Sequence, residues 1–264
     1  MNRPSNRLSG VLGLLAGVAL VVTACGAPAL PALTDPTEIV TAALASTEGA
    51  KSVHVEFKLE GSINADLTGT GGTGTSISLQ GTTASADVDM AGGKAHAMVA
   101  VPALLNLSAD LIQIGETTYL KSSLGGPLYE TMQATDELPV DPTDASAIFD
   151  DIGDLLTADG VDPVKGDDVD CGGRQCYTVM IELTPDELAA LGGAGATELV
   201  PLDLATASLA FTIRVEKDTR LLAGINAIAS LGAQGSLTLD IAFSKWDQPV
   251  DISPPPADQI KPAT

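Results

Sequence analysis

The chain contains few aromatic and few basic residues. Aromatic side chains make up 3% of the 264 residues, although hydrophobic residues make up 45%. A core built from such small aliphatic side chains either collapses fully or leaves an interior cavity. Only 13 residues are Lys or Arg, against 34 Asp or Glu, which gives a net charge of −21. Such a surface repels phosphate backbones, so we expect no nucleic-acid partner.

Residues that could perform covalent chemistry are also scarce. The two histidines, His54 and His96, alternate with their neighbours in the manner of solvated strand residues. No Gly-x-Ser-x-Gly or His-Glu-x-x-His pattern occurs, which removes the common signatures of lipases and zinc hydrolases. The acidic segment 150–170 lacks the spacing of an EF-hand loop and is typical of a solvated face. We therefore expect no catalytic residue, no metal and no cofactor. A hydrolase would have to depend on His54 or His96.

The first 25 residues have the order of a secretory leader. Arg3 and Arg7 precede an apolar run from Val11 to Val22, and small residues then lead into Cys25. This order predicts a signal peptide over residues 1–24. The alternative is an uncleaved membrane helix at the short limit for spanning about 30 Å of hydrocarbon. The leader holds two basic and no acidic residues, so the mature chain would carry a charge of −23.

The sequence Val22-Thr23-Ala24-Cys25 resembles the lipobox of bacterial lipoproteins. The resemblance implies that Cys25 becomes the first mature residue and carries thioether-linked diacylglycerol with acyl chains such as palmitate. It also implies that the protein works outside the cytoplasm, anchored to the cell membrane. Residues 25–34, rich in Pro and Ala, would form the lipidated tether.

Two cysteines remain in the mature chain beyond the anchor. Cys171 and Cys176 are separated by Gly-Gly-Arg-Gln, and an oxidising compartment favours a disulfide across this turn. A thioredoxin-like site has two intervening residues rather than four. A zinc site would need two further Cys or His ligands.

The periodicity of the remaining chain predicts strands with a few helices. Asp35-Pro36-Thr37-Glu38 is typical of a helix start, and Gly49 ends that helix. From Ser52, apolar and polar residues alternate, as in half-buried strands. Helical spacing returns in residues 144–159 and 184–191.

Turns and the tail complete this outline. Gly92-Gly93, Gly115-Glu116 and Lys217-Asp218 lie between alternating segments and predict hairpin turns. The proline-rich residues 249–264 predict an extended tail. We therefore expect a single α+β domain over residues 35–260, with a large curved antiparallel sheet and helices on one side.

The aliphatic face of this sheet is the candidate binding site. Removing a sixteen-carbon chain from a bilayer costs ~12 kcal/mol at ~0.8 kcal/mol per methylene, so only an enclosed apolar cavity could bind it. The alternative is that helices fill this face and form an ordinary core. The predicted cavity residues are Val55, Phe57, Val99, Leu120, Val179, Ile181, Phe211, Ile213, Leu239 and Ile241.

Four features resemble the actinobacterial LppX/LprA/LprF/LprG lipoprotein family. They are the lipobox, the early helix leading into residues 50–55, the hairpin of residues 114–120, and the ending at residues 243–254. The resemblance implies a curved antiparallel half-barrel, similar to LolA/LolB carriers, with helices covering the concave side. It implies binding and transport of lipids or lipoglycans in an apolar cavity, without enzymatic activity. An envelope transporter is a further partner that it implies.

The chain departs from the family pattern at Cys171 and Cys176 and in its long acidic stretch, which leaves the particular lipid open. The alternative function is a structural or sensory envelope domain that binds another protein and has a filled core.

Overall fold

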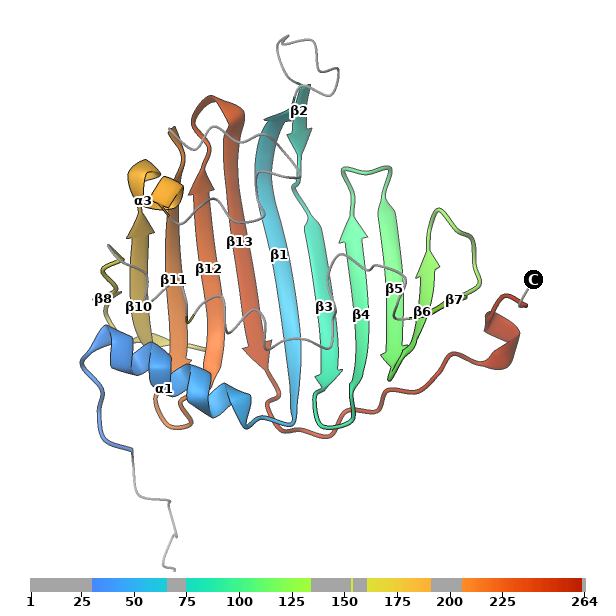
Figure 1. The fold of residues 1–264 in the computed structure, drawn as a ribbon, viewed down its shortest axis with the longest axis horizontal. Helices are drawn as coiled ribbons and strands as arrows, with labels where there is room; N and C mark the ends of the chain where they lie inside the picture. Colours follow the sequence, from blue (N-terminus) through green and yellow to red (C-terminus); the bar gives the residue numbers. More distant parts are fainter. Residues whose placement is uncertain (1–29, 66–74, 134–152, 154–160, 191–205, 263–264) are drawn as a thin grey trace, which may run out of the picture. The chain divides into compact units, whose positions relative to one another are not determined.

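The alternation that begins at Ser52 builds one long, open antiparallel sheet (Figure 1). The computed structural model describes residues 30–65, 75–133, 153, 161–190 and 206–262. Within these ranges the strands follow the order β7-β6-β5-β4-β3-β1-β13-β12-β11-β10-β8, with β2 beside β1 and β9 beside β10. The strands are β1 (Ser52–Ala65), β2 (Thr75–Ser78), β3 (Thr82–Asp89), β4 (Lys94–Val101), β5 (Leu107–Ile114), β6 (Thr117–Ser122), β7 (Glu130–Gln133), β8 (Val164–Lys165), β9 (Val169–Asp170), β10 (Gln175–Leu183), β11 (Ser208–Glu216), β12 (Leu222–Ser230) and β13 (Gly235–Ser244).

The described helices begin at the predicted capping sequences. For α1 (Pro36–Glu48), the Asp35 carboxylate accepts a 2.9 Å hydrogen bond from the Glu38 amide, and proline occupies the first position. For α3 (Pro185–Ala190), the Thr184 amide donates to Glu187 Oε2 at 2.6 Å. Short 3-10 turns are η2 (Gly232–Gln234) and η3 (Ala257–Gln259). The helix predicted over residues 144–159 lies outside the described residues, apart from residue 153.

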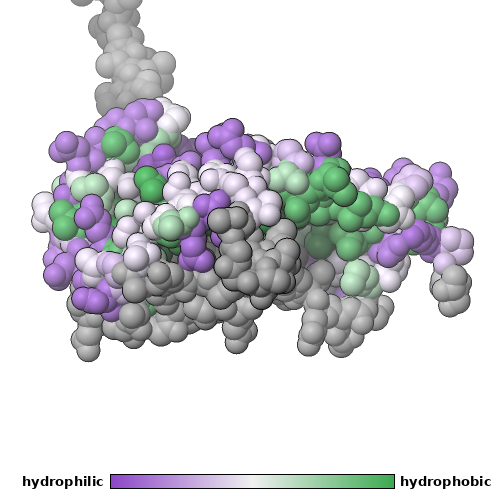
Figure 2. Space-filling model, turned by 90° about the horizontal axis from the view of Figure 1, so that it is seen from above, coloured by the Kyte–Doolittle hydropathy of each residue, from purple (hydrophilic) through white to green (hydrophobic). Residues whose placement is uncertain are grey.

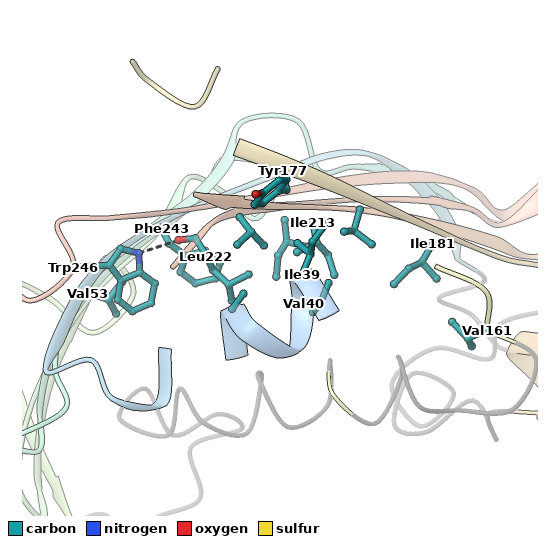
Figure 3. Packing of buried hydrophobic residues seen from close by; sticks show 14 of the residues in the cluster. Ile39, Val40, Val53, Val161, Tyr177, Ile181, Ile213, Leu222, Phe243 and Trp246 are labelled. Carbon is teal, nitrogen blue, oxygen red and sulfur yellow. Dashed lines mark hydrogen bonds between the residues drawn. The ribbon is translucent and has the colours of Figure 1, made fainter. Parts of the chain in front are cut away.

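Helix α1 packs in the concavity of the curved sheet (Figure 3). Its fully buried Ile39 and Val40 belong to one apolar cluster with Ile213 of β11 and Leu222 of β12. At the edge of that cluster, the Trp246 indole donates a 2.9 Å hydrogen bond to the Leu222 carbonyl. The predicted architecture, a curved antiparallel half-barrel with helical cover on the concave side, is confirmed.

The C-terminal segment follows the opposite face of the sheet. Ile112 neighbours Gln113 in β5 and therefore points away from the α1 side, and the tail residue Ile252 packs on it with Tyr129. Two backbone bonds of 2.8 Å then join Tyr129 to Gln259 and Lys261. The tail, which the sequence predicted to be extended, therefore runs as an irregular segment from the end of β13 to Tyr129, next to the edge strand β7. We call it the C-terminal strap.

The α1 packing makes a testable contribution to stability. Ile39→Ala leaves a cavity in a site with no solvent exposure and should reduce the free energy of unfolding by about 2–5 kcal/mol. Thr41→Ala, on the exposed side of the same helix, should change it by less than about 0.5 kcal/mol. Urea unfolding followed by Trp246 fluorescence measures both variants. Equal stability of the two variants would show that α1 does not belong to the cooperative unit.

Candidate functional site

Strand register places all ten predicted cavity residues on one face of the sheet. Cα partners across neighbouring strands point to the same side, and each predicted residue falls in one of three rows. From β10 towards β6, the central row is Val179, Ile213, Ile225, Ile241, Phe57, Ala84, Val99, Ala109 and Ser122. The two flanking rows hold Ile181, Phe211, Ala227, Leu239 and Leu59, and Phe243, Val55, Ala86, Ala97, Leu111 and Leu120.

One half of this face is filled by α1. Val179, Ile181 and Ile213 are almost completely buried in the cluster that contains Ile39 and Val40. Partly buried residues at its margin are Val55, Phe211 and Ile241. Under α1, therefore, the face forms an ordinary packed core, as the filled-core alternative expected.

The other half of the face lies beyond the main contacts of α1, which are with β10, β11 and β12. Strands β3 to β6 direct only uncharged residues to this side. Alanines line its middle, and Val99 retains 38% of its solvent exposure. Small side chains leave depth above the backbone, so this half is the part of the face where an apolar ligand could lie.

Polar side chains interrupt the apolar face at the end near the β5–β6 turn. Gln113 and Thr118 are Cα partners and are almost fully buried. Within the described part of the chain, Gln113 Oε1 and Thr118 Oγ1 have no hydrogen-bond partner. Leaving such atoms unpaired is costly, so Gln113 Oε1 could accept a hydrogen bond from a polar ligand group, and Thr118 Oγ1 could accept or donate one. Sequence reasoning missed them, although Gln113 falls in an apolar phase of the alternation.

A groove of about 720 Å³ crosses β1 and β3 to β6 on the opposite face. Its walls are two rows of side chains from positions that alternate with Phe57 and Val99 and therefore point away from α1. These wall residues include Glu56, Lys58, Met98, Asp110 and Lys121. Its lining is therefore partly charged, in contrast with the α1 side. The sequence analysis did not predict this groove.

Both histidines lie on this charged face, and each has an acidic partner. His54 Nδ1 is 2.7 Å from Asp87 Oδ1, and His96 Nε2 is 2.9 Å from Asp110 Oδ1. The expectation of solvated histidines is wrong for His54, whose side chain is 16% exposed. The reason is cross-strand pairing, which places Asp87 between the two histidines. Within the described ranges, the polar partners of both rings are carboxylates, and neither ring is hydrogen-bonded to a hydroxyl or thiol nucleophile.

The beginning of the described chain is fixed to the sheet near Tyr177. The Tyr177 hydroxyl accepts a 3.0 Å bond from the Leu33 amide, and Arg220 donates to the Pro31 carbonyl. Burial raises the pKa of Tyr177, but the bond from Leu33 and the nearby Arg220 and Lys217 charges outweigh it and lower the pKa. The tether is therefore held in place as far as Pro31.

The predicted disulfide between Cys171 and Cys176 is present in the β9–β10 hairpin. Gly172 and Gly173 both have positive φ angles, of 70° and 89°, as a tight two-residue turn requires. Among the described residues, no three His, Cys, Asp or Glu side chains are placed to bind a metal ion. Nor does any described helix have the length and apolarity needed to cross a bilayer.

The network around Asp110 predicts a pH dependence of stability. Burial opposes ionisation, but hydrogen bonds from Tyr129, His96 and Lys121 outweigh it and hold the pKa of Asp110 below its ordinary 3.8. A depressed folded pKa stabilises the fold above the ordinary value, and this contribution is lost as pH falls through the folded pKa. Asp110→Asn should therefore cost about 1.5–3 kcal/mol at neutral pH and flatten the acid limb of the stability curve.

Urea unfolding between pH 7 and pH 2 measures this effect. Asp218→Asn, in an exposed turn, is the control and should leave the acid limb unchanged. An Asp110 variant with the same acid limb as the parent would contradict the assignment.

No protein-family model matches the chain, and no curated protein matches it. Among solved structures, LprF from Mycobacterium bovis shares 18% identity, over 83% of this chain and 96% of LprF, with a TM-score of 0.50. Lipoprotein LppX from Mycobacterium tuberculosis also shares 18% identity, over 83% and 98%, with a TM-score of 0.49. A LolA superfamily protein from Nitrosomonas europaea shares 9%, over 87% and 99%, with a TM-score of 0.26. The chain therefore has the fold of LprF, as its resemblance to that family predicted.

Proposed function

We propose that the protein is a membrane-anchored extracytoplasmic lipoprotein of the LppX/LprF type that binds an acylated lipid or lipoglycan. The observation that carries this proposal is the uncharged aliphatic face of β3 to β6, which continues beyond the contacts of α1 and keeps Val99 partly exposed. Binding involves no covalent chemistry. The lipid-binding domain is residues 35–260.

The shape of this face suits an acyl chain better than a bulky polar ligand. Ala84, Ala97 and Ala109 form a shallow floor, and half-buried Leu111 and Leu120 stand beside it. Each methylene withdrawn from water or lipid needs ~0.8 kcal/mol of replacement contact, which aliphatic walls provide. Among the predicted residues, Val55, Phe57, Val99 and Leu120 would contact the ligand. The buried residues Val179, Ile181 and Ile213 pack against α1 and would stabilise the curved sheet without contacting the ligand.

Gln113 and Thr118 would bind the polar part of the same ligand. Their unpaired oxygens lie on the aliphatic face, at the end opposite the β4–β5 loop. A hydroxyl or amide of the lipid would satisfy them and fix its orientation. The resemblance extends the role to transport, with an envelope transporter as partner.

Anchoring would depend on Cys25. The mature charge of −23 gives no electrostatic attraction to anionic lipid, so the acyl chains would have to tether the protein. Residues 1–24 would be removed as a signal peptide. Residues 25–34 would connect the anchor to α1, with Pro31 and Leu33 already held by Arg220 and Tyr177.

A second candidate is a non-carrier domain that binds another envelope protein. The filled packing under α1 favours it, because the filled half offers no room for a ligand. The two functions make different predictions for bound lipid.

Val99→Glu should reduce the amount of lipid that co-purifies with the protein. A carboxylate on this face would have to be buried against an acyl chain, which is strongly unfavourable. Met98→Glu is the matched control, because Met98 precedes it in β4, is 52% exposed, and points to the opposite face. Mass spectrometry of organic extracts from full-length protein, expressed in an actinobacterial host, quantifies the lipid.

We expect near-stoichiometric lipid in the parent and the Met98 variant, and a loss of at least about tenfold in the Val99 variant. A parent protein without lipid would contradict the carrier function and favour the protein-binding one. Equal lipid in both variants would place the ligand elsewhere.

Cys25→Ser should prevent acylation. We expect the parent to incorporate labelled palmitate and to fractionate with membranes, and the variant to incorporate none. The measurement is labelling followed by mass analysis of the N-terminal peptide. Cys171→Ser is the control, because it replaces another cysteine without touching the lipobox. Palmitate in the Cys25 variant would contradict the assigned anchor.

A further inference from the structure

Three strongly exposed leucines lie at one end of the sheet, in two neighbouring loops. Leu104 and Leu105 follow β4 and are 53% and 91% exposed, and Leu124 follows β6 and is 74% exposed. Seen from this end, a continuous hydrophobic patch covers the loops of β4–β5 and β6–β7 (Figure 2). Neither the proposed lipid-binding face nor the packed core uses these side chains.

Hydrogen bonds join the β4–β5 and β6–β7 loops to each other and fix their conformation. The Ser123 amide donates to the Ser108 carbonyl at 2.8 Å, and the Ser108 amide donates to Ser123 Oγ at 3.0 Å. Leu105 has a φ of 55°, a left-handed conformation that is sterically unfavourable for a leucine. Turn bonds on both sides of it, from Asn106 to Pro102 and from Leu107 to Leu104, fix this conformation. The exposure of Leu105 is thus built into the loop.

The loops are electrically neutral in a strongly acidic protein. No charged residue occurs in residues 101–109 or 122–129, although the chain has 34 acidic residues. Charged side chains would resist transfer into hydrocarbon, whereas leucine favours it. The absence of charge therefore suits contact with the apolar layer of a bilayer.

The size of the patch also favours a bilayer over a protein. Three leucine side chains offer on the order of 100 Å² of apolar surface each. A stable protein interface buries about 800 Å² per partner. Protruding leucine tips are too small for such an interface, but they are sufficient for a reversible contact of a tethered protein with lipid.

The position of the tether determines which bilayer the leucines meet. Pro31 and Leu33 are bound by Arg220 and Tyr177, at the strand ends opposite the β4–β5 loop. An eight-residue strand such as β4 spans about 27 Å. The six residue-to-residue steps from Cys25 to Pro31 reach at most about 22 Å. In an upright domain, the leucine end therefore points away from its own membrane.

We propose that Leu104, Leu105 and Leu124 form a docking tip that inserts into a second bilayer, facing the one that holds the anchor. The tip would bring the open half of the aliphatic face to the lipid surface where cargo is exchanged. This proposal rests on the proposed lipid carriage, but insertion and lipid binding are separately measurable.

Insertion is tested with a fluorophore at the tip of the full-length lipoprotein. Leu105→Cys introduces a free thiol, because Cys25 is acylated and the other cysteines form a disulfide. The protein, labelled with an NBD dye, is reconstituted through its anchor into phosphatidylcholine vesicles. Acceptor vesicles of phosphatidylcholine with a nitroxide on the acyl chain are then added. Glu116→Cys, in the exposed β5–β6 turn at the other strand ends, is the control position.

We expect acceptor vesicles to quench the dye at position 105 and not at position 116. Equal quenching at both positions, or none at either, would overturn the proposal. Quenching only when the nitroxide is in the anchoring vesicles would overturn the assignment to a second bilayer.

A second variant separates docking from lipid binding. Replacing Leu104, Leu105 and Leu124 by serine should slow transfer of a fluorescent lipid between vesicles about tenfold or more, with unchanged lipid bound per purified protein. Ile228→Ser is the control, because Ile228 is 51% exposed and lies in β12. Unchanged transfer in the triple variant would overturn the docking tip. A parent protein that inserts but holds no lipid would contradict carriage alone.

Discussion

The rest of the structure depends on one constraint: the antiparallel sheet, with thirteen strands among the described residues, has a wide apolar face, and the 13-residue helix α1 covers only part of it. Register commits the apolar side chains of all the long strands to the same side, because the side-chain period of a strand is two. Where α1 lies against β10 to β12, burial is nearly complete. Beyond it, Val88 and Ala95 are still buried but Val99 is 38% exposed, and this partly exposed area connects the fold to the proposed lipid.

The two faces of the sheet have different chemistry because each uses one phase of the alternation. The face opposite α1 holds the histidine–aspartate pairs and the Tyr129–Asp110–Lys121 network, which connects β5 and β6 to the C-terminal strap. Such a network orders one side of the sheet through hydrogen bonds and ion pairs. Consequently, the other side is free to bind an uncharged ligand without losing the interactions that fix the strands.

Local signals in the sequence predicted the elements, but not how distant elements meet. Asp35, Thr184 and the Gly115-Glu116 turn between Ile114 and Thr117 act within four residues, so their caps and hairpin could be predicted. The same alternation placed ten aliphatic residues on one face. It could not show that α1 covers Ile213 and leaves Val99 partly exposed, because helix docking depends on contacts between remote segments. The pairing of β1 with β13 and the Asp partners of both histidines are non-local for the same reason.

The two ends of the strands differ in what they carry, so the sheet has a tether end and a leucine end. At one end, Tyr177 and Arg220 hold the segment that follows the proposed anchor, by bonds to the Leu33 amide and the Pro31 carbonyl. At the other end, the loops after β4 and β6 carry neutral, exposed leucines. A long flexible tether would let either end of the domain face the anchoring membrane, and the difference between the two ends would then have no effect. Because the chain is fixed from Pro31, the tether is short, and the orientation of the sheet determines which surface its leucines can reach.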